Sequence, residues 1–244
     1  MLENWKDEAP RDRIIVALDC DRARALDLAD MLSGHAAWLK IGMTLFYKLG
    51  PQIVYELKER GFKIFLDLKF HDIPHQVRGA ASSATHNGAD MLTMHAVGGL
   101  PMMQAAVEGA RTAASDFGIP EPVTLGITVL TSMNAETLAT TGVTRSVEEQ
   151  VRALASMAKE AGLSGVVASP LEAPILRELL GPNAFIVTPG VRPTWASKGD
   201  QSRVTTPAMA FENGASHLVI GRPITEADDP VAAFERIVSE LEEA

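Results

Sequence analysis

Apolar runs rich in β-branched residues alternate with amphipathic segments along the whole chain. Eight of these runs have the length and composition of strands, and they lie at 13–19, 38–43, 63–69, 91–96, 123–130, 165–169, 184–189 and 217–222. The clearest helical spacing between them is found at 51–61, 101–115 and 147–162. Several segments close on a glycine before the next strand, as at Gly61, Gly88, Gly162 and Gly214. Glycine there is typical of a left-handed helix stop, so the pattern predicts eight consecutive βα units.

Eight βα units predict a (β/α)8 TIM barrel, because this fold typically needs about 250 residues and the chain has 244. A doubly wound open sheet uses the same units and is the alternative. The count of eight favours a closed barrel, and no Gly-x-Gly-x-x-Gly turn follows the first strand. No linker, low-complexity segment or change of composition divides the chain, so residues 1–244 are predicted to form one domain.

Charge and cysteine content narrow the class of protein. The net charge of −9 argues against a general nucleic-acid or anionic-membrane binder, so an anionic ligand would need positive charge gathered in one cleft. A single cysteine, Cys20, excludes an internal disulfide and a cysteine-rich metal site. The start of the chain does not resemble a signal peptide, and no apolar stretch has the length of a membrane span. We therefore expect a cytoplasmic protein.

The third predicted strand carries two distinct sets of side chains, since residues two apart share one face. The apolar set faces the surrounding helices and comprises Ile64, Leu66, Leu68 and Phe70. Phe65, Asp67 and Lys69 then face the barrel interior. Asp67 and Lys69 are expected about 6–7 Å apart along the strand, near its carboxyl end.

The first two strands follow the same rule. Their outward residues are Val16, Leu18, Leu39 and Ile41, whereas Asp19 and Lys40 point inward. Three neighbouring strands thus bring four charges to the carboxyl end of the barrel, the face where such barrels keep their active sites. A structural ion network is the alternative interpretation, but buried ionic networks stabilise weakly. Four charges with Asp72 just beyond favour a functional site, in which Lys69 is a proton donor or an electrostatic clamp rather than a Schiff-base nucleophile.

A phosphate site is predicted after the last two strands, because the loops there usually bind phosphate in this fold. Gly221 lets the backbone approach a ligand, and Arg222 offers a forked cation. Arg192 and Gln201 belong to the preceding loop, 190–203, which has the length and composition of a functional lid. An ordinary surface arginine behind a turn glycine is the alternative.

Three histidines lie near these charges. His95 shares the inward face of its strand with Thr93, and we expect a hydrogen-bonded barrel histidine there rather than a general base. His71 and His75 flank Asp72 without the spacing of a zinc site, although spacing alone leaves a magnesium site open.

These motifs together resemble one family. "DLKFHDIP", with "VALD" and "LKIG" upstream and "LGITVLTSM", "TPGVRP" and "VIGRPI" downstream, is similar to the bacterial orotidine 5'-phosphate decarboxylases, in order along nearly the whole chain. The Asp-x-Lys-x-x-Asp core alone is shared with a wider suite that includes sugar-phosphate aldolases. The resemblance implies conversion of orotidine 5'-monophosphate (OMP) to uridine 5'-monophosphate (UMP), without metal or organic cofactor, as the last step of pyrimidine synthesis.

The resemblance also implies a role for each matching residue. Lys69 would donate a proton to C6 of the pyrimidine, and Asp67 would lie beside the departing carboxylate. Lys40 would support these charges and contact the ribose, whose hydroxyls Asp19 would hold. The pyrimidine edge is assigned to Thr131, and the phosphate to Arg222, Gly221 and Gln201, with Arg192 nearby on the lid.

The resemblance further implies a homodimer in which Asp72 and Ile73 enter the active site of the other subunit. The chain departs from the family at Gln76, where a threonine is common. That side chain would contribute a hydrogen bond to the partner's site near the ribose, and glutamine is longer.

Two other functions remain as alternatives. A metal-dependent aldolase or decarboxylase of the same suite would act on a sugar phosphate and would need Mg²⁺ on the acids. A non-catalytic nucleotide-binding barrel would bind UMP without turning over OMP, but binding alone does not explain Asp67 beside Lys69.

Overall fold

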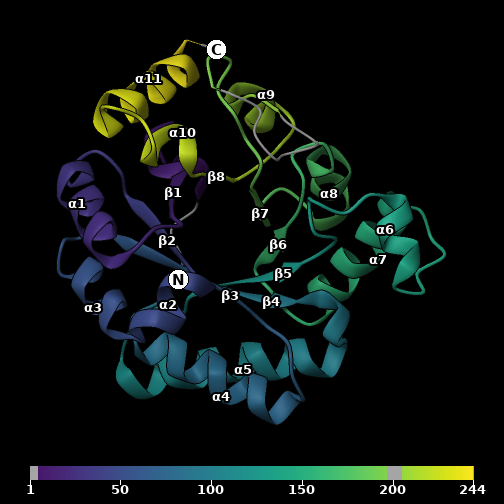
Figure 1. Cartoon of the computed structure of the whole chain (residues 1–244). Coiled ribbons are helices and arrows are strands. Elements are labelled where there is room, and N and C mark those ends of the chain that lie inside the picture. Colours follow the sequence, from purple (N-terminus) through teal and green to yellow (C-terminus); the bar gives the residue numbers. More distant parts are fainter. Residues whose placement is uncertain (1–4, 197–204, 244) are drawn as a thin grey trace.

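The chain folds as a closed barrel of eight parallel strands in sequence order, as the computed structural model shows for residues 5–196 and 205–243 (Figure 1). The strands are β1 Ile14–Leu18, β2 Trp38–Gly42, β3 Lys63–Phe70, β4 Met91–His95, β5 Val123–Ile127, β6 Gly165–Val167, β7 Phe185–Thr188 and β8 His217–Ile220. Each lies within a segment predicted from the sequence or exceeds it by one residue, and β1 pairs with β8 to close the ring. The TIM barrel is confirmed, and the open doubly wound sheet is wrong.

Helices surround the strands on all sides (Figure 1). They are α1 Arg22–Leu32, α2 Met43–Leu49, α3 Gln52–Lys58, α4 Pro74–His86, α5 Leu100–Phe117, α6 Ala135–Thr140, α7 Val147–Glu160, α8 Ala173–Leu180, α9 Pro207–Glu212, α10 Arg222–Thr225 and α11 Pro230–Glu242. Short 3-10 helices lie at Trp5–Asp7, Pro10–Arg13 and Ala96–Gly98. α7 shows how local sequence sets the bounds: a capping box of Ser146 and Glu149 begins it, and Gly162 follows its end with a φ of +83°.

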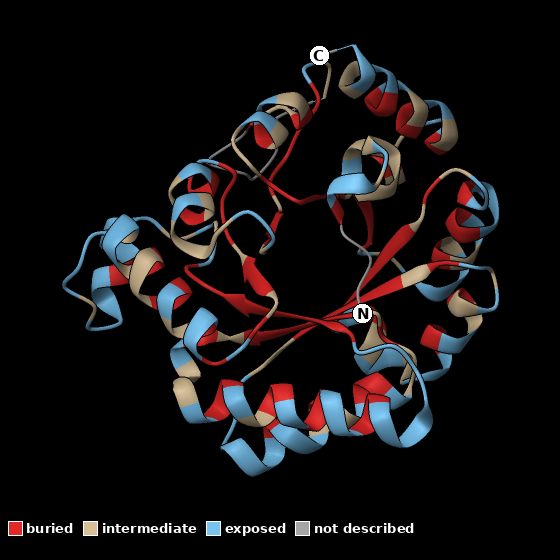
Figure 2. Ribbon diagram, turned by 180° about the vertical axis from the view of Figure 1, so that it is seen from behind, coloured by how far each residue is buried: buried red, intermediate tan, exposed pale blue. Residues whose placement is uncertain are grey.

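Alternation along the strands separates two apolar cores. Outward residues such as Val16, Leu39 and Ile64 pack against the helices, whereas Ile15 and Phe65 belong to a cluster inside the barrel. Figure 2 shows the buried strands and the buried inner faces of the helices, with the outer faces exposed. The outward and inward predictions for the first three strands are therefore confirmed.

A helix that crosses a bilayer needs about 20 mostly apolar residues. None of the helices within residues 5–196 and 205–243 is both long enough and apolar enough to do so.

Candidate active site

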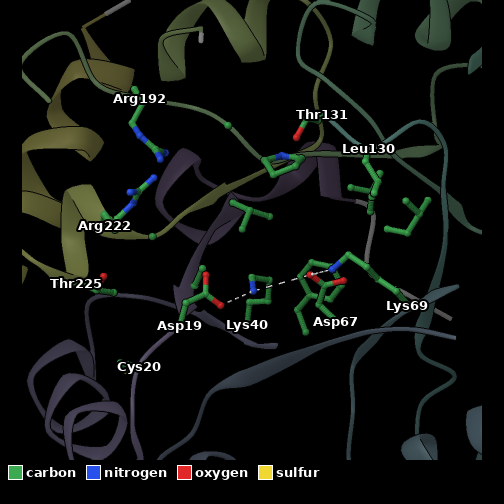
Figure 3. A pocket seen from close by; sticks show the side chains of 18 of the residues that line it. Asp19, Cys20, Lys40, Asp67, Lys69, Leu130, Thr131, Arg192, Arg222 and Thr225 are labelled. Atoms are coloured by element: carbon green, nitrogen blue, oxygen red, sulfur yellow. Dashed lines mark hydrogen bonds and ion pairs between the residues drawn. The ribbon is translucent and has the colours of Figure 1, made fainter. Parts of the chain in front are cut away.

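A cavity of about 730 Å³ opens at the carboxyl ends of the strands. Its apolar floor is made by side chains of the barrel interior, Ala17, Phe65, Ile127, Val167 and Val219. Above this floor, Asp19, Lys40, Asp67 and Lys69 follow one another along one side, as Figure 3 shows. The four charges predicted from three strands are thus brought together in one site.

These four side chains form a row of alternating charge. Nζ of Lys40 lies 3.1 Å from Oδ1 of Asp19 and 3.8 Å from Oδ2 of Asp67. Nζ of Lys69 donates to the same Oδ2 of Asp67 at 2.8 Å. The Lys40 and Asp67 side chains are only 9% and 12% exposed, whereas that of Asp19 is 70% exposed. The inner members of the row are therefore poorly hydrated, which strengthens their fields inside the cavity.

Gly42, at the end of β2, leaves room for this row. A Cβ there would lie 3.2 Å from both Oδ1 of Asp19 and Nζ of Lys40. The sequence motif "LKIG" therefore supplies a cation and the space beside it.

The β3 strand departs from regular geometry where it carries the charges. Its pairing with β4 shifts register between Leu66 and Phe70. Lys69 has a φ of +52° and is the only non-glycine among the described residues with a positive φ. Irregular strand geometry of this kind is over-represented next to active sites, where it re-aims a side chain.

The other end of the cavity is lined by two arginines. Arg192, on the loop after β7, and Arg222, the first residue of α10 after β8, point toward one another, as Figure 3 shows. Arg192 is 7% exposed, and its Nη1 donates to the Val191 carbonyl at 2.9 Å. Gly221 also lines the cavity beside Arg222. Two guanidinium groups facing one cavity suit an anion such as phosphate.

The predicted lid, 190–203, begins at this arginine end. An isolated bridge pairs Val191 with Thr205, and the Arg192 amide donates to the Thr205 carbonyl at 3.0 Å. Both ends of the loop are thus tied together at its base. Gln201 and the rest of 197–203 lie outside the described residues.

Thr131 lines the cavity, whereas three other predicted residues do not. Thr131 follows β5 and lies beside Leu130, as Figure 3 shows. Asp72, Ile73 and Gln76 are exposed, and Ile73 is 62% exposed. Within residues 5–196 and 205–243, the Asp72 carboxylate accepts a hydrogen bond only from the neighbouring Ile73 amide, at 2.6 Å. A single chain does not bring this group into its own cavity.

The structure places His95 beside the site but not in it. Its ring lies 5.5 Å from that of His71 between centroids. No hydrogen bond joins its ring to another described side chain or carbonyl, and the prediction of a hydrogen-bonded barrel histidine stays a prediction. Burial lowers the pKa of His95, and the neighbouring charges of His71 and Lys69 lower it further.

Residues 5–196 and 205–243 contain no cluster of typical metal ligands. No group of three or more His, Cys, Asp or Glu side chains there is close enough to hold a metal ion. His71 and His75 therefore form no such group with Asp72.

Sequence reasoning missed some residues of the site. Cys20, Arg24, Thr225 and Glu226 line the cavity, and burial, with the nearby acids Asp21 and Asp19, raises the pKa of the Cys20 thiol. These four residues follow β1 or β8 at the carboxyl end of the barrel. Their position after these two strands was a signal from which they could have been predicted to line the site. Thr93, whose hydroxyl donates to Oδ1 of Asp67 at 2.9 Å, was predicted to face inward without any role.

Comparison with known proteins places this cavity in context. Residues 12–237 match the model of the "Orotidine 5'-phosphate decarboxylase / HUMPS family". The orotidine 5'-phosphate decarboxylase of Moorella thermoacetica is 52% identical, over 95% of this chain and 93% of its own. That of Pelobacter propionicus is 46% identical over 97% of each chain. The crystal structure of the Lactobacillus acidophilus orotidine 5'-phosphate decarboxylase superposes with a TM-score of 0.84 at 39% identity, covering 94% of this chain and 99% of its own.

Proposed function

The chain belongs to the orotidine 5'-phosphate decarboxylase / HUMPS family, and we propose that it is a carbon-carbon lyase that converts OMP to UMP and CO₂. One observation carries the proposal: the row from Asp19 to Lys69 lies along the same cavity as Arg192 and Arg222. OMP is a nucleotide with a phosphate at one end and a carboxylated pyrimidine at the other. The cavity offers a cationic end and a mixed-charge end for these two groups.

Phosphate binding belongs at the arginine end. Arg192 and Arg222 would hold the phosphate, with Gly221 allowing close approach of the backbone and Gln201 adding an amide. Binding energy from this remote group can be used to close the 190–203 lid and orient the pyrimidine. Asp19, with its exposed carboxylate, would accept hydrogen bonds from the ribose hydroxyls, Lys40 would contact the ribose, and Thr131 would meet the pyrimidine edge.

Lys69 stabilises the negative charge that forms on C6 of the pyrimidine and then protonates this carbon. The bond between C6 and the carboxylate breaks, CO₂ leaves, and the electron pair stays on C6. This carbanion lies in the plane of the ring, so the π system cannot delocalise it. An ammonium at 4 Å stabilises a unit negative charge by about 4 kcal/mol at an effective dielectric of 20, and Lys69 then donates its proton to C6.

Asp67 acts on the leaving group. Its carboxylate is fixed by Lys69, Lys40 and Thr93, so it cannot easily move away from a second carboxylate placed next to it. Repulsion between the two would be relieved when CO₂ departs, which destabilises the bound substrate relative to the transition state. No cofactor takes part in this sequence of steps.

The complete site is proposed to need two chains. Asp72, Ile73 and Gln76 are exposed near the cavity-bearing end of β3 and stay outside the cavity of their own chain. In a homodimer, Asp72 and Ile73 would enter the partner's cavity, and Gln76 would donate or accept a hydrogen bond near the ribose. The expected setting is the cytoplasm, in the last step of UMP synthesis.

The test follows OMP absorbance with purified protein after exhaustive chelation. We expect rapid conversion to UMP by the chelated protein and near-complete loss of activity in Lys69→Ala. Loss of activity on chelation, restored by Mg²⁺, would instead favour a metal-dependent member of the suite. UMP binding without turnover of OMP would favour a non-catalytic nucleotide-binding barrel.

The shared site has its own test. Lys69→Ala and Asp72→Ala chains, each inactive alone, are mixed under conditions that allow subunits to exchange. Each mixed dimer contains one site with both native residues and one with neither. We therefore expect about a quarter of the native activity after random exchange of equal amounts, and half if every dimer is mixed. No recovery after demonstrated exchange would mean that each chain completes its own site.

A further inference from the structure

Thr93 lies behind the row of charges and hydrogen-bonds to two of its members, Asp67 and Lys69. It is completely buried in β4. Its Oγ1 donates to Oδ1 of Asp67 at 2.9 Å and accepts the backbone N–H of Lys69, also at 2.9 Å. A hydroxyl has one hydrogen and two lone pairs, so both bonds form at the same time. One oxygen atom therefore links the Asp67 carboxylate to the peptide that carries Lys69.

The strand pairing explains why a side chain is needed there. Leu66 pairs with Leu92, and the next pair is Phe70 with Met94. The three residues Asp67, Leu68 and Lys69 thus lie opposite Thr93 alone. A regular ladder cannot satisfy the extra backbone groups of such a bulge. The Thr93 hydroxyl accepts the Lys69 N–H in place of a backbone carbonyl.

The same bond restrains an unfavourable backbone conformation. Lys69 has a φ of +52°, which residues with a Cβ adopt only when their surroundings hold them there. This conformation directs the Lys69 side chain so that its Nζ reaches Oδ2 of Asp67 at 2.8 Å. Thr93 fixes the other oxygen, Oδ1, of the same carboxylate.

We propose that Thr93 is a positioning residue for the reaction: it sets the separation and orientation of the Lys69 ammonium and the Asp67 carboxylate. The inference rests on the proposed decarboxylation. It goes beyond it by assigning a role to a residue that does not line the cavity and does not touch the substrate. Misplacement of reacting groups by about 1 Å can lower a rate by roughly 10²-fold, so a residue that fixes two of them should affect turnover strongly.

The test compares two substitutions of Thr93 with one at a matched site. Thr93→Val keeps the branched shape and removes both hydrogen bonds, whereas Thr93→Ser keeps the hydroxyl. Thr85→Val is the control, because Thr85 is equally buried but donates only to the Ala81 carbonyl in its own helix, at 2.8 Å. Both valine variants lose a buried hydroxyl, so a general loss of stability affects them alike.

We expect kcat for OMP to fall by roughly 10²-fold in Thr93→Val, while KM and the Kd for UMP change by less than about 3-fold because the phosphate and ribose contacts are untouched. Thr93→Ser should recover kcat to within about 5-fold of the native value, and Thr85→Val should keep it. If Thr93→Val is poorly folded, Thr93→Cys, with a weak donor and acceptor, takes its place with the same expected fall. Unchanged kcat in the folded variant, or failure of serine to restore it, would overturn the inference.

A crystal structure of Thr93→Val separates this inference from the proposed function. If the native protein does not convert OMP, the proposed activity is wrong. The positioning role of Thr93 is then tested only by the geometry of the Thr93→Val crystal structure. We expect a longer contact between Nζ of Lys69 and Oδ2 of Asp67, or a Lys69 φ outside the positive region. Geometry identical to that of the native chain would contradict the role of Thr93.

Discussion

Both ends of the barrel gather charged side chains, but the two clusters differ in what surrounds them. At the carboxyl end, Lys40, Asp67 and Lys69 border a cavity of about 730 Å³. At the amino end, Glu8 lies 3.5 Å from both Lys63 and His217. The His217 and Glu8 side chains there are only 1% and 15% exposed, whereas that of Lys63 is 41% exposed.

The cover at the amino end is built around Trp5. Its ring lies 5.0 Å from the guanidinium carbon of Arg13 and 5.0 Å from that of Arg177. Arg13 also stacks on Phe211 at 4.0 Å and donates to the Ser216 carbonyl at 2.8 Å. Planar guanidinium groups can satisfy carbonyls and rings together, so these charges serve as packing.

His217 has a similar environment. It is completely buried, with its ring 5.8 Å from that of Trp38 and 5.5 Å from that of Phe185. A structural ion network, the alternative considered for the carboxyl end, is a fitting description of this buried cluster at the amino end. Both ends thus carry charges of both signs, and the carboxyl end differs in that its row lines a cavity of about 730 Å³, which is why we place the proposed active site there.

Removing the ammonium at the open end should have the largest functional effect. Lys69→Met keeps the length of the side chain and removes its charge, so we expect kcat for OMP to fall by about 10⁴-fold or more. Asp67 keeps Lys40 and Thr93 as partners, so Tm should change by less than about 3 °C. A Lys69→Met variant that loses stability but keeps its activity would mean that the charges at the carboxyl end serve the fold rather than the reaction.

Removing the Trp5 ring should do the opposite. Trp5→Ala takes away a nearly buried ring and its hydrogen bond to the Asn183 carbonyl, which should lower the free energy of unfolding by about 3 kcal/mol. Calorimetry should show a Tm lower by roughly 6–12 °C. The kcat of the folded fraction should stay within about 2-fold of the native value, and a large fall in kcat would show that the amino end contributes to turnover.

Acid should weaken the covered end first. Burial lowers the pKa of His217, with Glu8 opposing and Arg13 and Lys63 adding to the shift. A folded pKa below the ordinary value of 6.5 means that the unfolded state binds the proton more readily. Stability conferred by neutral His217 is therefore present above that pH and declines as pH falls below it. His217→Gln should flatten the dependence of Tm on pH between about 6.5 and 5; an equally steep dependence would assign it to other groups.

Substitution of one glycine at each end of the barrel should separate an effect on activity from an effect on stability, with smaller changes than those above. A Cβ on Gly42 meets only the flexible ends of Asp19 and Lys40 at 3.2 Å, whereas one on Gly165, at the start of β6, would lie 1.9 Å from the Phe185 carbonyl oxygen. Gly42→Ala should lower kcat/KM by roughly 3- to 10-fold with little change in Tm. Gly165→Ala should lower Tm and leave kcat unchanged, and similar effects of the two would contradict the distinction.

Local pattern predicted the frame of the molecule and the main charges of its site. The eight apolar runs became the eight strands, and alternation of two alone placed Asp19, Lys40, Asp67 and Lys69 around one cavity. Both inferences use only the period of a strand and the common edge of parallel strands. Arg192 and Arg222 followed from their positions after the last two strands.

What could not be predicted depends on contacts between distant segments. The shift between β3 and β4, and the role of Thr93 within it, depends on pairing register, which no local pattern encodes. Trp5 and the Asn183 carbonyl are 178 residues apart in sequence, so the covered amino end had no local indication either. The role proposed for Asp72 and Ile73 depends on a second chain and remains a prediction.

The most direct test of the proposed chemistry is a crystal structure of the protein with UMP. We predict that Nζ of Lys69 lies about 3 Å from C6 of the pyrimidine, with the phosphate between Arg192 and Arg222. An ammonium turned away from the ring, or a divalent ion bound between Asp67 and its neighbouring acids, would contradict proton donation by Lys69.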